Sequence, residues 1–225
     1  MKLSRNHPAR AFTFVELLIV IAVLFVLAAL LLPTLVSTSG GRSSRINCSN
    51  NLKQIGLAFR TWALDNGDKY PMQIAVTNGG TMDLVESGMV FRHFQVMSNE
   101  LSTPKILFCP EENDRKRAPA NTFQSAISSS LAVPLTNDNQ ISYFVGVDAN
   151  PLWLSGDRNL AFNGVPAKRG LNAISTNSAV AWVPPRHGNG GNIGLADGSV
   201  QGVSTSGLRP MLLGTGLATN RLAMP

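Results

Sequence analysis

The chain has 225 residues, of which 44% are hydrophobic and only 14% are charged. This length allows one compact domain with an appendage but not two large enzyme domains, and the low charged fraction argues against a disordered charged tail or a salt-bridged coiled coil. The formal net charge is +6, but three of the 19 basic residues, Lys2, Arg5 and Arg10, lie in the first ten positions. The other 16 nearly balance the 13 acidic residues, so the composition does not indicate a nucleic-acid partner.

The N-terminal segment is basic over residues 1–11 and then strongly apolar. Within residues 12–32 only Thr13 and Glu16 are polar. A helix of this length extends about 30 Å, the thickness of the hydrocarbon core of a bilayer, so the sequence predicts a transmembrane helix. Because basic residues precede the segment and none follows before Arg42, we expect the N-terminus in the cytoplasm and the rest of the chain outside.

A cleaved secretory signal peptide is the alternative interpretation of this segment. The apolar run is longer than the roughly 7 to 15 residues usual in such signals. It also contains an acid, and the small-residue stretch at 37–41 lies beyond Pro33. We therefore favour a segment that stays in the mature protein.

Glu16 is unusual in this position, because an ionised carboxylate within a membrane helix costs about 2–3 kcal/mol on insertion scales. Such a residue either has a partner for its charge or lies at the headgroup boundary. Glu16 taken alone leaves both interpretations open.

Residues 11–16 (AFTFVE), with basic residues before them and an unbroken apolar run after them, resemble the processing site of type IV prepilins and type II secretion pseudopilins. The resemblance implies that a prepilin peptidase cuts between Ala11 and Phe12 and methylates the new amine. Glycine is the usual residue before the cut in that family, so Ala11 is a departure from the pattern. Pro33 becomes mature residue 22, where the family commonly has proline.

The same resemblance implies a protein in three parts: a cytoplasmic leader at 1–11 that is removed, a transmembrane assembly segment at 12–36, and a periplasmic domain at 37–225. It implies a single pass through a bacterial inner membrane, with prepilin peptidase and other pilin-like subunits as partners. The new amine at Phe12 would lie near the depth of Glu16. We hypothesise that one subunit's carboxylate pairs with a neighbour's amine and that this pair sets the register of a filament.

A second helical segment is predicted after Pro33. Its apolar residues recur at intervals of three and four, which is the pattern of one buried helix face: Cys48, Leu52, Ile55, Phe59 and Trp62. The run at 65–68 (DNGD) offers a glycine for a left-handed cap and predicts the end of the helix. We therefore expect a long N-terminal helix, interrupted after Pro33, whose second half packs on the rest of the chain.

The two cysteines, Cys48 and Cys109, favour a disulfide, because an even count outside the cytoplasm usually pairs and Cys48 lies on the apolar helix face. It could meet there a predicted strand at 106–110. Closing a loop of this length contributes about 4 kcal/mol in the chain-entropy model. Two buried thiols are the alternative. The histidines at 7, 93 and 187 show no ligand-pair spacing, so the sequence does not indicate zinc.

The C-terminal part is predicted to be rich in β-structure. Short β-prone runs occur at 141–147, 159–162, 179–183, 192–196 and 199–203. Asp197 and Gly198 join the last two runs and predict a two-residue hairpin. We expect an α+β, pilin-like fold, with the second half of the long helix packed on a C-terminal antiparallel sheet. The intervening segments 111–117 and 125–139 are predicted to be solvated loops.

Nine residues separate His187 from Asp197-Gly198, and this spacing resembles the C-terminal H-x9-DG signature of a large subgroup of prepilin-like proteins. The segments 48–56 (CSNNLKQIG) and 108–110 (FCP) look like other recurrent segments of that subgroup. Histidine with aspartate can indicate a hydrolase, but the sequence has no Gly-x-Ser-x-Gly elbow. We interpret Asp197 as a turn residue and His187 as a hydrogen-bonding tie between the glycine-rich loop and the hairpin, and we expect no catalytic residue.

Some pseudopilins bind calcium in a distal loop, and two sets of oxygen ligands could do so here: Asp65 with Asp68, or Asp148 with Asn150 and Asp157. Neither set has the full spacing of a recognised calcium motif. We interpret both sets as turn residues and expect no metal and no other cofactor.

These observations together predict a structural subunit without enzyme activity. We expect a pseudopilin that is stacked through its N-terminal helix into the short periplasmic filament of a type II secretion system. One alternative is a type IV pilin of a surface fibre used in adhesion, motility or DNA uptake. The other is a membrane-anchored periplasmic enzyme.

Overall fold

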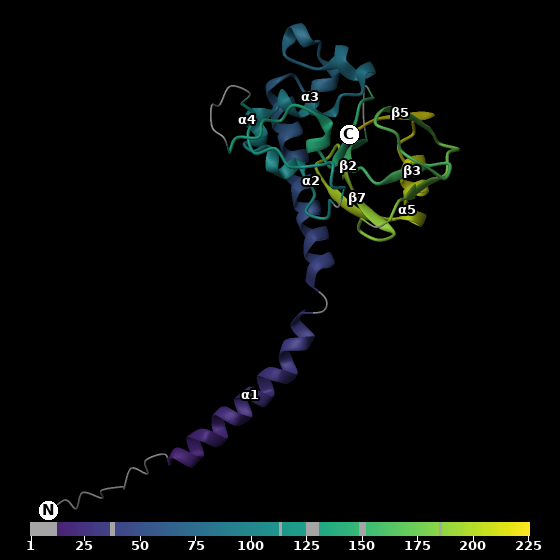
Figure 1. Cartoon of the computed structure of the whole chain (residues 1–225). Helices are drawn as coiled ribbons and strands as arrows, with labels where there is room; N and C mark the ends of the chain where they lie inside the picture. Colours follow the sequence, from purple (N-terminus) through teal and green to yellow (C-terminus); the bar gives the residue numbers. More distant parts are fainter. Residues whose placement is uncertain (1–12, 37–38, 113, 125–130, 149–151, 185) are drawn as a thin grey trace, which may run out of the picture. The chain divides into compact units, whose positions relative to one another are not determined.

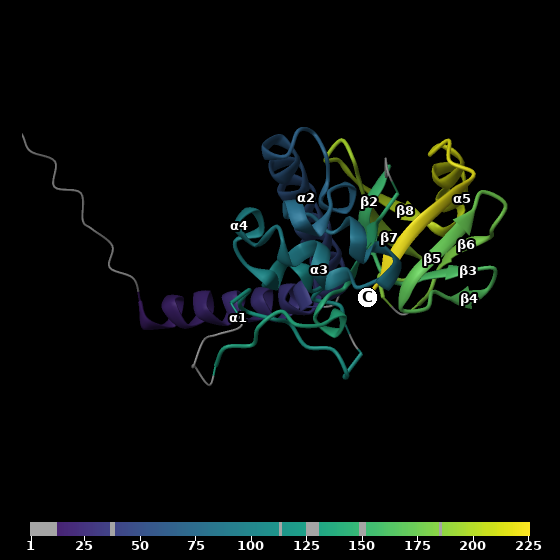
Figure 2. The same ribbon diagram turned by 90° about the horizontal axis from the view of Figure 1, so that it is seen from above.

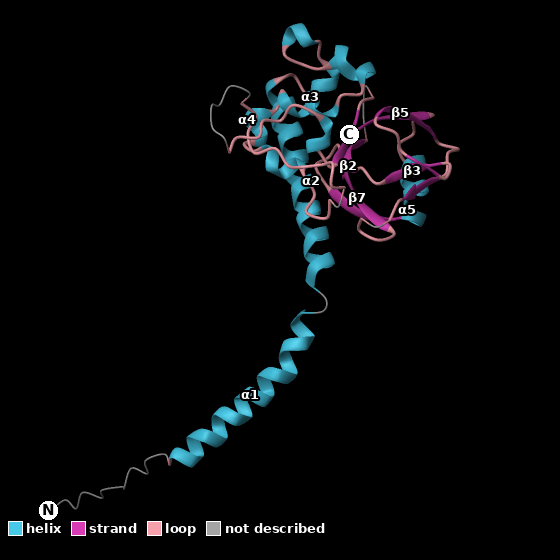
Figure 3. Ribbon diagram, in the orientation of Figure 1, coloured by secondary structure: helices cyan, strands magenta, loops and turns pink. Residues whose placement is uncertain are grey.

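The computed structural model of the chain describes residues 13–36, 39–112, 114–124, 131–148, 152–184 and 186–225. The chain forms two compact units, Met1–Arg42 and Ser43–Pro225. Helices occupy the N-terminal part, and strands are concentrated in the C-terminal part (Figure 1, Figure 3). This arrangement confirms the predicted α+β class.

Helix α1 (Phe14–Val36) begins with a reciprocal cap. The Glu16 backbone N–H donates to the Thr13 hydroxyl at 3.3 Å, and Glu16 Oε2 accepts from the Thr13 N–H and from its hydroxyl at 2.8 Å each. Such a capping box satisfies backbone donors that the first turn leaves without partners. The helix continues past Pro33 to Val36. Over the part of the chain that the structure describes, none of the helices combines the length and the apolar character needed to cross a membrane.

Helix α2 (Ser39–Asp65) presents the apolar face that the periodicity predicts. All five residues of the predicted stripe are buried: Cys48, Leu52, Ile55, Phe59 and Trp62. The helix ends at the predicted place, because Gly67 and Asp68 adopt left-handed conformations with φ of 66° and 58°. The Asp68 N–H then donates to the Ala63 carbonyl at 2.9 Å, which satisfies an acceptor at the helix end.

Short helical turns fill the segment between α2 and the first strand. They are η1 (Pro71–Gln73), η2 (Val76–Asn78), η3 (Met82–Ser87), α3 (Val90–Gln95), α4 (Ser98–Leu101), η4 (Pro104–Leu107) and η5 (Asp138–Gln140). The prediction of a strand at 106–110 was wrong. Pro104 has its φ fixed near the helical value and the Thr103 hydroxyl accepts from the Lys105 N–H at 3.4 Å, so the chain forms a 3-10 turn up to Leu107.

The C-terminal part contains two antiparallel sheets. The larger has six strands in the order β5-β9-β1-β2-β7-β8, and the smaller has three in the order β4-β3-β6. The strands are β1 (Tyr143–Gly146), β2 (Trp153–Asp157), β3 (Leu160–Phe162), β4 (Val165–Pro166), β5 (Gly170–Ser175), β6 (Val180–Trp182), β7 (Gly190–Leu195), β8 (Val200–Ser204) and β9 (Thr219–Met224). Helix α5 (Thr205–Leu213) lies between the last two strands in sequence. The five predicted runs correspond to β1, β3, β6, β7 and β8.

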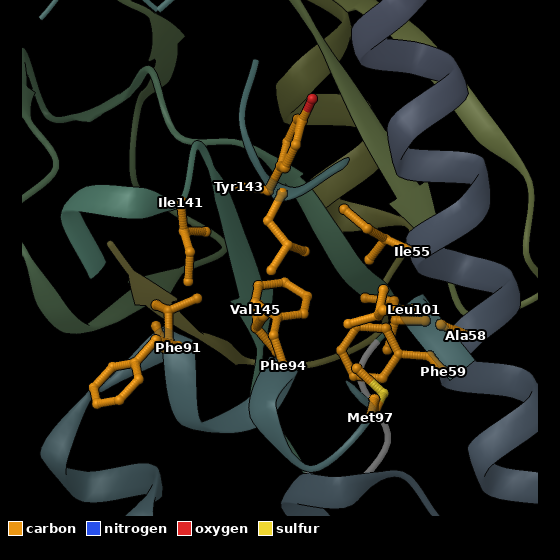
Figure 4. Packing of buried hydrophobic residues seen from close by; sticks show 14 of the residues in the cluster. Ile55, Ala58, Phe59, Phe91, Phe94, Met97, Leu101, Ile141, Tyr143 and Val145 are labelled. Atoms are coloured by element: carbon orange, nitrogen blue, oxygen red, sulfur yellow. The ribbon is translucent and has the colours of Figure 1, made fainter. Parts of the chain in front are cut away.

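The six-stranded sheet is covered on both faces (Figure 2). On one face, Tyr143 and Val145 of β1 join a cluster with α2, α3 and α4, and Figure 4 shows Phe59, Phe94 and Val145 in this cluster. On the other face, Phe144 joins a second cluster with α5 and the smaller sheet. Because alternate residues of β1 point to opposite faces, every residue of this strand is buried.

We predict that Phe59→Ala lowers the free energy of unfolding by about 3–5 kcal/mol, because the fully buried ring packs on Phe94 and Tyr70 with centroids 6.0 Å away in each case. Leu57→Ala on the same helix is the matched control. Leu57 is 65% exposed, so its removal should change stability by no more than about 0.5 kcal/mol. Urea unfolding followed by tryptophan fluorescence measures both, and equal effects would contradict the packing described here.

Candidate functional site

The predicted processing site, Ala11 and Phe12, lies outside the described residues. Glu16, the third residue of that prediction, lies at the start of α1 and uses one carboxylate oxygen, Oε2, for both bonds to Thr13. The cap gives Glu16 a local role that was not among the sequence-based expectations. Its signal was the spacing Thr13-x-x-Glu16, which is the signature of a capping box.

Cys48 and Cys109 form a disulfide, with their Cα atoms 5.5 Å apart. Cys48 lies on the buried face of α2, and Cys109 follows η4. Both side chains are fully buried. The bond therefore ties the helix to the segment that leads to the sheet.

His187 lies against this disulfide. Its Nε2 is 3.5 Å from Cys109 Sγ and 3.6 Å from Asp157 Oδ2. Its backbone N–H donates to Glu111 Oε2 at 2.9 Å, and its Nδ1 lies 2.7 Å from the same oxygen, although without hydrogen-bond geometry. The expected tie from His187 to the hairpin is thus replaced by contacts with the disulfide and two acids. A left-handed backbone at His187, with φ of 53°, turns the side chain inward from the loop before β7.

Asp157 is the buried acid at the end of β2. Its Oδ2 accepts from the Asn192 backbone N–H at 2.7 Å and from the Asn192 side-chain amide at 2.9 Å. Its Oδ1 is buried and has no hydrogen-bond partner among the described residues. Asp157 was considered in the sequence only as a calcium ligand, so its contact with His187 is new.

Asp197 and Gly198 form the predicted β7–β8 turn. Asp197 Oδ1 accepts from the Ser199 N–H at 2.8 Å, and Gly198 adopts a φ of 87° that favours glycine. The turn also lies on α2, because a Cβ added to Gly56 would be 3.7 Å from the Cα of Gly198. The preceding Ala196 carbonyl accepts from the Tyr70 hydroxyl at 3.0 Å and from Arg60 at 3.4 Å. The turn and the histidine loop therefore contact α2 or its disulfide from opposite ends of β7.

Glu112 shows that the segment 111–117 is not the simple solvated loop that we predicted. Its side chain is fully buried and forms a bidentate pair with Arg158, at 3.1 Å from Nε and 2.9 Å from Nη2. Arg186 is a second ion-pair partner, and the Ser142 hydroxyl donates to Oε2 at 3.0 Å. Burial would raise the pKa of Glu112, but the hydrogen bond from Arg158 and the charges of both arginines lower it to about 2. The sequence signal was a mixed charge cluster next to Cys109, and such a cluster is equally typical of a solvated surface loop.

Hydrogen bonds from one arginine side chain also fix the neighbouring loops. Arg117 donates to the carbonyls of Asp138 at 3.0 Å, Ile141 at 2.5 Å and Pro225 at 2.7 Å. The described end of the predicted loop 125–139 is buried at Leu135 and Asp138. Both segments that we predicted to be solvated are thus partly buried. A polar segment can be buried when its charges and amides find partners.

The structure places the described members of the two candidate calcium sets differently. Asp65 and Asp68 are exposed at the end of α2. Asp157 pairs with Tyr143 at one end of the β1–β2 ladder, whereas Asp148 follows the other end of β1 and accepts from the Arg221 N–H at 2.9 Å. Five residues of extended chain place these two aspartates about 17 Å apart. Asn150 lies outside the described residues.

Residues 6–32 match the family model of the prokaryotic N-terminal methylation motif. The chain therefore carries a prepilin-like N-terminus. The match includes Ala11, Phe12 and Glu16, and the motif implies processing by prepilin peptidase and assembly with other pilin subunits. It does not extend to the H-x9-DG segment. No curated protein and no solved structure matches the chain.

We predict that acid weakens the fold through Glu112. Its folded-state pKa of about 2 lies below its ordinary value of 4.5, so its contribution to stability is complete above about 4.5 and is lost as the pH falls toward about 2. Glu112→Gln should remove this part of the pH dependence and cost about 3–5 kcal/mol near neutral pH, because Arg158 and Arg186 lose their buried partner.

Glu86→Gln is the matched control. Glu86 also pairs with an arginine, Arg221 at 2.8 Å, but its side chain is 79% exposed. Such a pair contributes no more than about 1 kcal/mol. Urea unfolding at a series of pH values tests both variants, and an unchanged acid dependence in Glu112→Gln would contradict the role given to the buried pair.

Proposed function

We propose that the chain is a structural filament subunit, a pseudopilin of a type II secretion system, and that it has no enzyme activity. The observation that carries the proposal is the methylation motif at residues 6–32, which surface-fibre pilins and pseudopilins share. Processing at Phe12 would remove the basic leader and leave an apolar helix at the new N-terminus. Such a helix can pack side by side with the same helix of other copies and of related subunits.

The surface of α1 supports membrane anchoring as part of the proposal. All side chains described on this helix, from Phe14 to residue 29, are exposed, and nearly all of them are apolar. So large an apolar surface needs lipid or neighbouring helices to cover it. We place it in the inner membrane before assembly and between subunits afterwards, with residues 37–225 in the periplasm.

The geometry of Glu16 supports a charge pair between subunits. Both hydrogen bonds that its carboxylate accepts from Thr13 use Oε2, so Oε1 can accept from a neighbour's amine without breaking the cap. After cleavage, that amine would belong to Phe12. A carboxylate and an ammonium that are each costly in an apolar environment become tolerable as a pair.

The larger unit supports a mechanical role for the distal part. The disulfide ties α2 to the segment after η4, and the buried ion cluster ties that segment, through Glu112, to Arg158 after β2 and to Arg186 before β7. The β7–β8 hairpin contacts α2 directly. A subunit that is pushed as part of a filament needs its head fixed to its helix. In this proposal, His187, Asp197 and Gly198 serve that fixation.

We predict that Glu16→Val and Glu16→Gln are both cut and methylated at Phe12 but do not assemble. Glutamine can still close a capping box, whereas valine cannot, so the pair of variants separates the charge from the cap. Leaving the Phe12 amine without a carboxylate partner costs about 2–3 kcal/mol, which should reduce assembly by about 30- to 150-fold per contact. Filament yield after shearing or crosslinking is the measurement.

Thr13→Ala is the complementary control, because it removes the hydroxyl of the cap and keeps the charge of Glu16. This variant should assemble. Normal filaments from Glu16→Gln would refute the charge pair, and failure of Thr13→Ala alone would assign Glu16 to capping.

We predict that the mature protein from cells begins with N-methyl-phenylalanine at Phe12, as mass spectrometry of its N-terminal peptide would show. An unprocessed leader together with monomeric protein would refute the filament role and favour an anchored enzyme. Immunogold labelling of intact and of permeabilised cells then distinguishes the two kinds of filament. Labelling only after permeabilisation fits the proposed pseudopilus, and long labelled fibres on intact cells would replace it with a surface pilus.

A further inference from the structure

Four side chains of the kind that bind transition metals meet at one buried point. They come from α2, from the segment after η4, from the end of β2 and from the loop before β7: Cys48, Cys109, Asp157 and His187. One ligand atom from each lies within 4.8 Å of all the others. The cysteines and histidines show no ligand-pair spacing along the chain that would indicate zinc, but the fold brings together four distant segments.

Two of the distances already suit a tetrahedral metal site. His187 Nε2 is 3.5 Å from Cys109 Sγ and 3.6 Å from Asp157 Oδ2. Around zinc, with bonds of about 2.3 Å to sulfur and about 2.0–2.2 Å to nitrogen and oxygen, neighbouring ligand atoms are about 3.3–3.8 Å apart. The two sulfurs alone must separate, since they are joined in the disulfide.

The groups behind these ligands also fit a metal. Glu111 Oε2 lies 2.7 Å from His187 Nδ1, without hydrogen-bond geometry in the oxidised structure. A metal-bound histidine typically donates from this second ring nitrogen to such a carboxylate. Asn192 holds Asp157 by Oδ2, while the buried Oδ1 of Asp157 has no hydrogen-bond partner among the described residues. A cation held between His187 Nε2 and this carboxylate would neutralise the charge that Asn192 leaves uncompensated on Oδ1.

We propose that Cys48, Cys109, Asp157 and His187 form a zinc site when the disulfide is opened. A dithiol reductant would supply two electrons and two protons, so that it becomes a disulfide and the two cysteines become thiols. Each thiol releases its proton as its sulfur binds the metal, and His187 Nε2 and the Asp157 carboxylate complete the tetrahedron. Thiolate and imidazole ligands select zinc over calcium or magnesium.

The zinc site and the disulfide are two forms of the same cross-link. Each joins α2 at Cys48 to the segment at Cys109, and zinc adds direct bonds to β2 and to the loop before β7. The larger unit therefore keeps its helix fixed in both redox states. This inference does not depend on the filament role, because it concerns only the interior of the larger unit.

The test uses the full chain, purified in detergent and freed of metal. One sample stays oxidised and the other is reduced with a phosphine, which is then removed under nitrogen so that it does not compete for the metal. Cobalt(II) is titrated into both and is then displaced by zinc. We expect the reduced chain to take one cobalt with the visible absorption of a tetrahedral site and a thiolate charge-transfer band, and the oxidised chain to take none.

Two variants identify the ligands other than sulfur. His187→Ala and Asp157→Asn should each weaken binding of zinc to the reduced chain by at least about tenfold. Asp197→Asn is the matched control, because Asp197 belongs to the same H-x9-DG segment but lies at the turn after β7. It should bind zinc as the unchanged chain does.

Two results would overturn the proposal. One is a reduced chain that takes no cobalt, whether it remains folded or unfolds by tryptophan fluorescence. The other is equal affinity in His187→Ala and the unchanged chain, because an unfolded dithiol binds cobalt without help from the histidine.

Discussion

The cross-link between Cys48 and Cys109 is the constraint on which the larger unit depends. It fixes α2 to the segment that leads into the sheet, across a sequence separation of 61 residues. In the chain-entropy model a loop of this size contributes about 4 kcal/mol, a large share of the stability of an ordinary domain. Glu111 and Glu112 follow Cys109 after Pro110, so the bond also holds them close to the interior. The buried ion cluster is thus a consequence of where the disulfide lies.

Local patterns were sufficient to predict the elements that have local causes. The stripe ending at Trp62 predicted the buried face of α2, Gly67 predicted its end, and Asp197-Gly198 predicted the β7–β8 hairpin. Strands β5 and β9 have no comparable signal. Residues 219–224 form a strand because they pair with β1 on one side and β5 on the other, and the pairing partner rather than the intrinsic propensity decides such a case.

The candidate site was predictable only in part, for the same reason. Sequence spacing singled out His187 and both cysteines, but it placed the histidine with the hairpin and the cysteines elsewhere. Asp157 and Glu111 could not be assigned to them, since contacts between four distant segments leave no period along the chain. The error about 111–117 has a different origin. A charged run is usually solvated, and Glu112 can be buried because Arg158, which follows β2, and Arg186, before β7, pair with its charge.

The spacing of the H-x9-DG segment follows from the distance it must cover. His187 is fixed at the disulfide of Cys48, and the carbonyl before Asp197 is fixed by Arg60, three and a third turns further along α2 and so about 18 Å away. A six-residue strand such as β7 extends about 20 Å, which matches.

The glycines of β7 also have a packing cause. A Cβ on Gly191 would lie 2.6 Å from the Trp182 ring, and that ring's indole N–H donates to the Val203 carbonyl at 2.9 Å.

One residue more in β7 would turn every following side chain to the other face of the sheet. The number of residues between the histidine and the turn therefore matches the length of α2 that the hairpin covers.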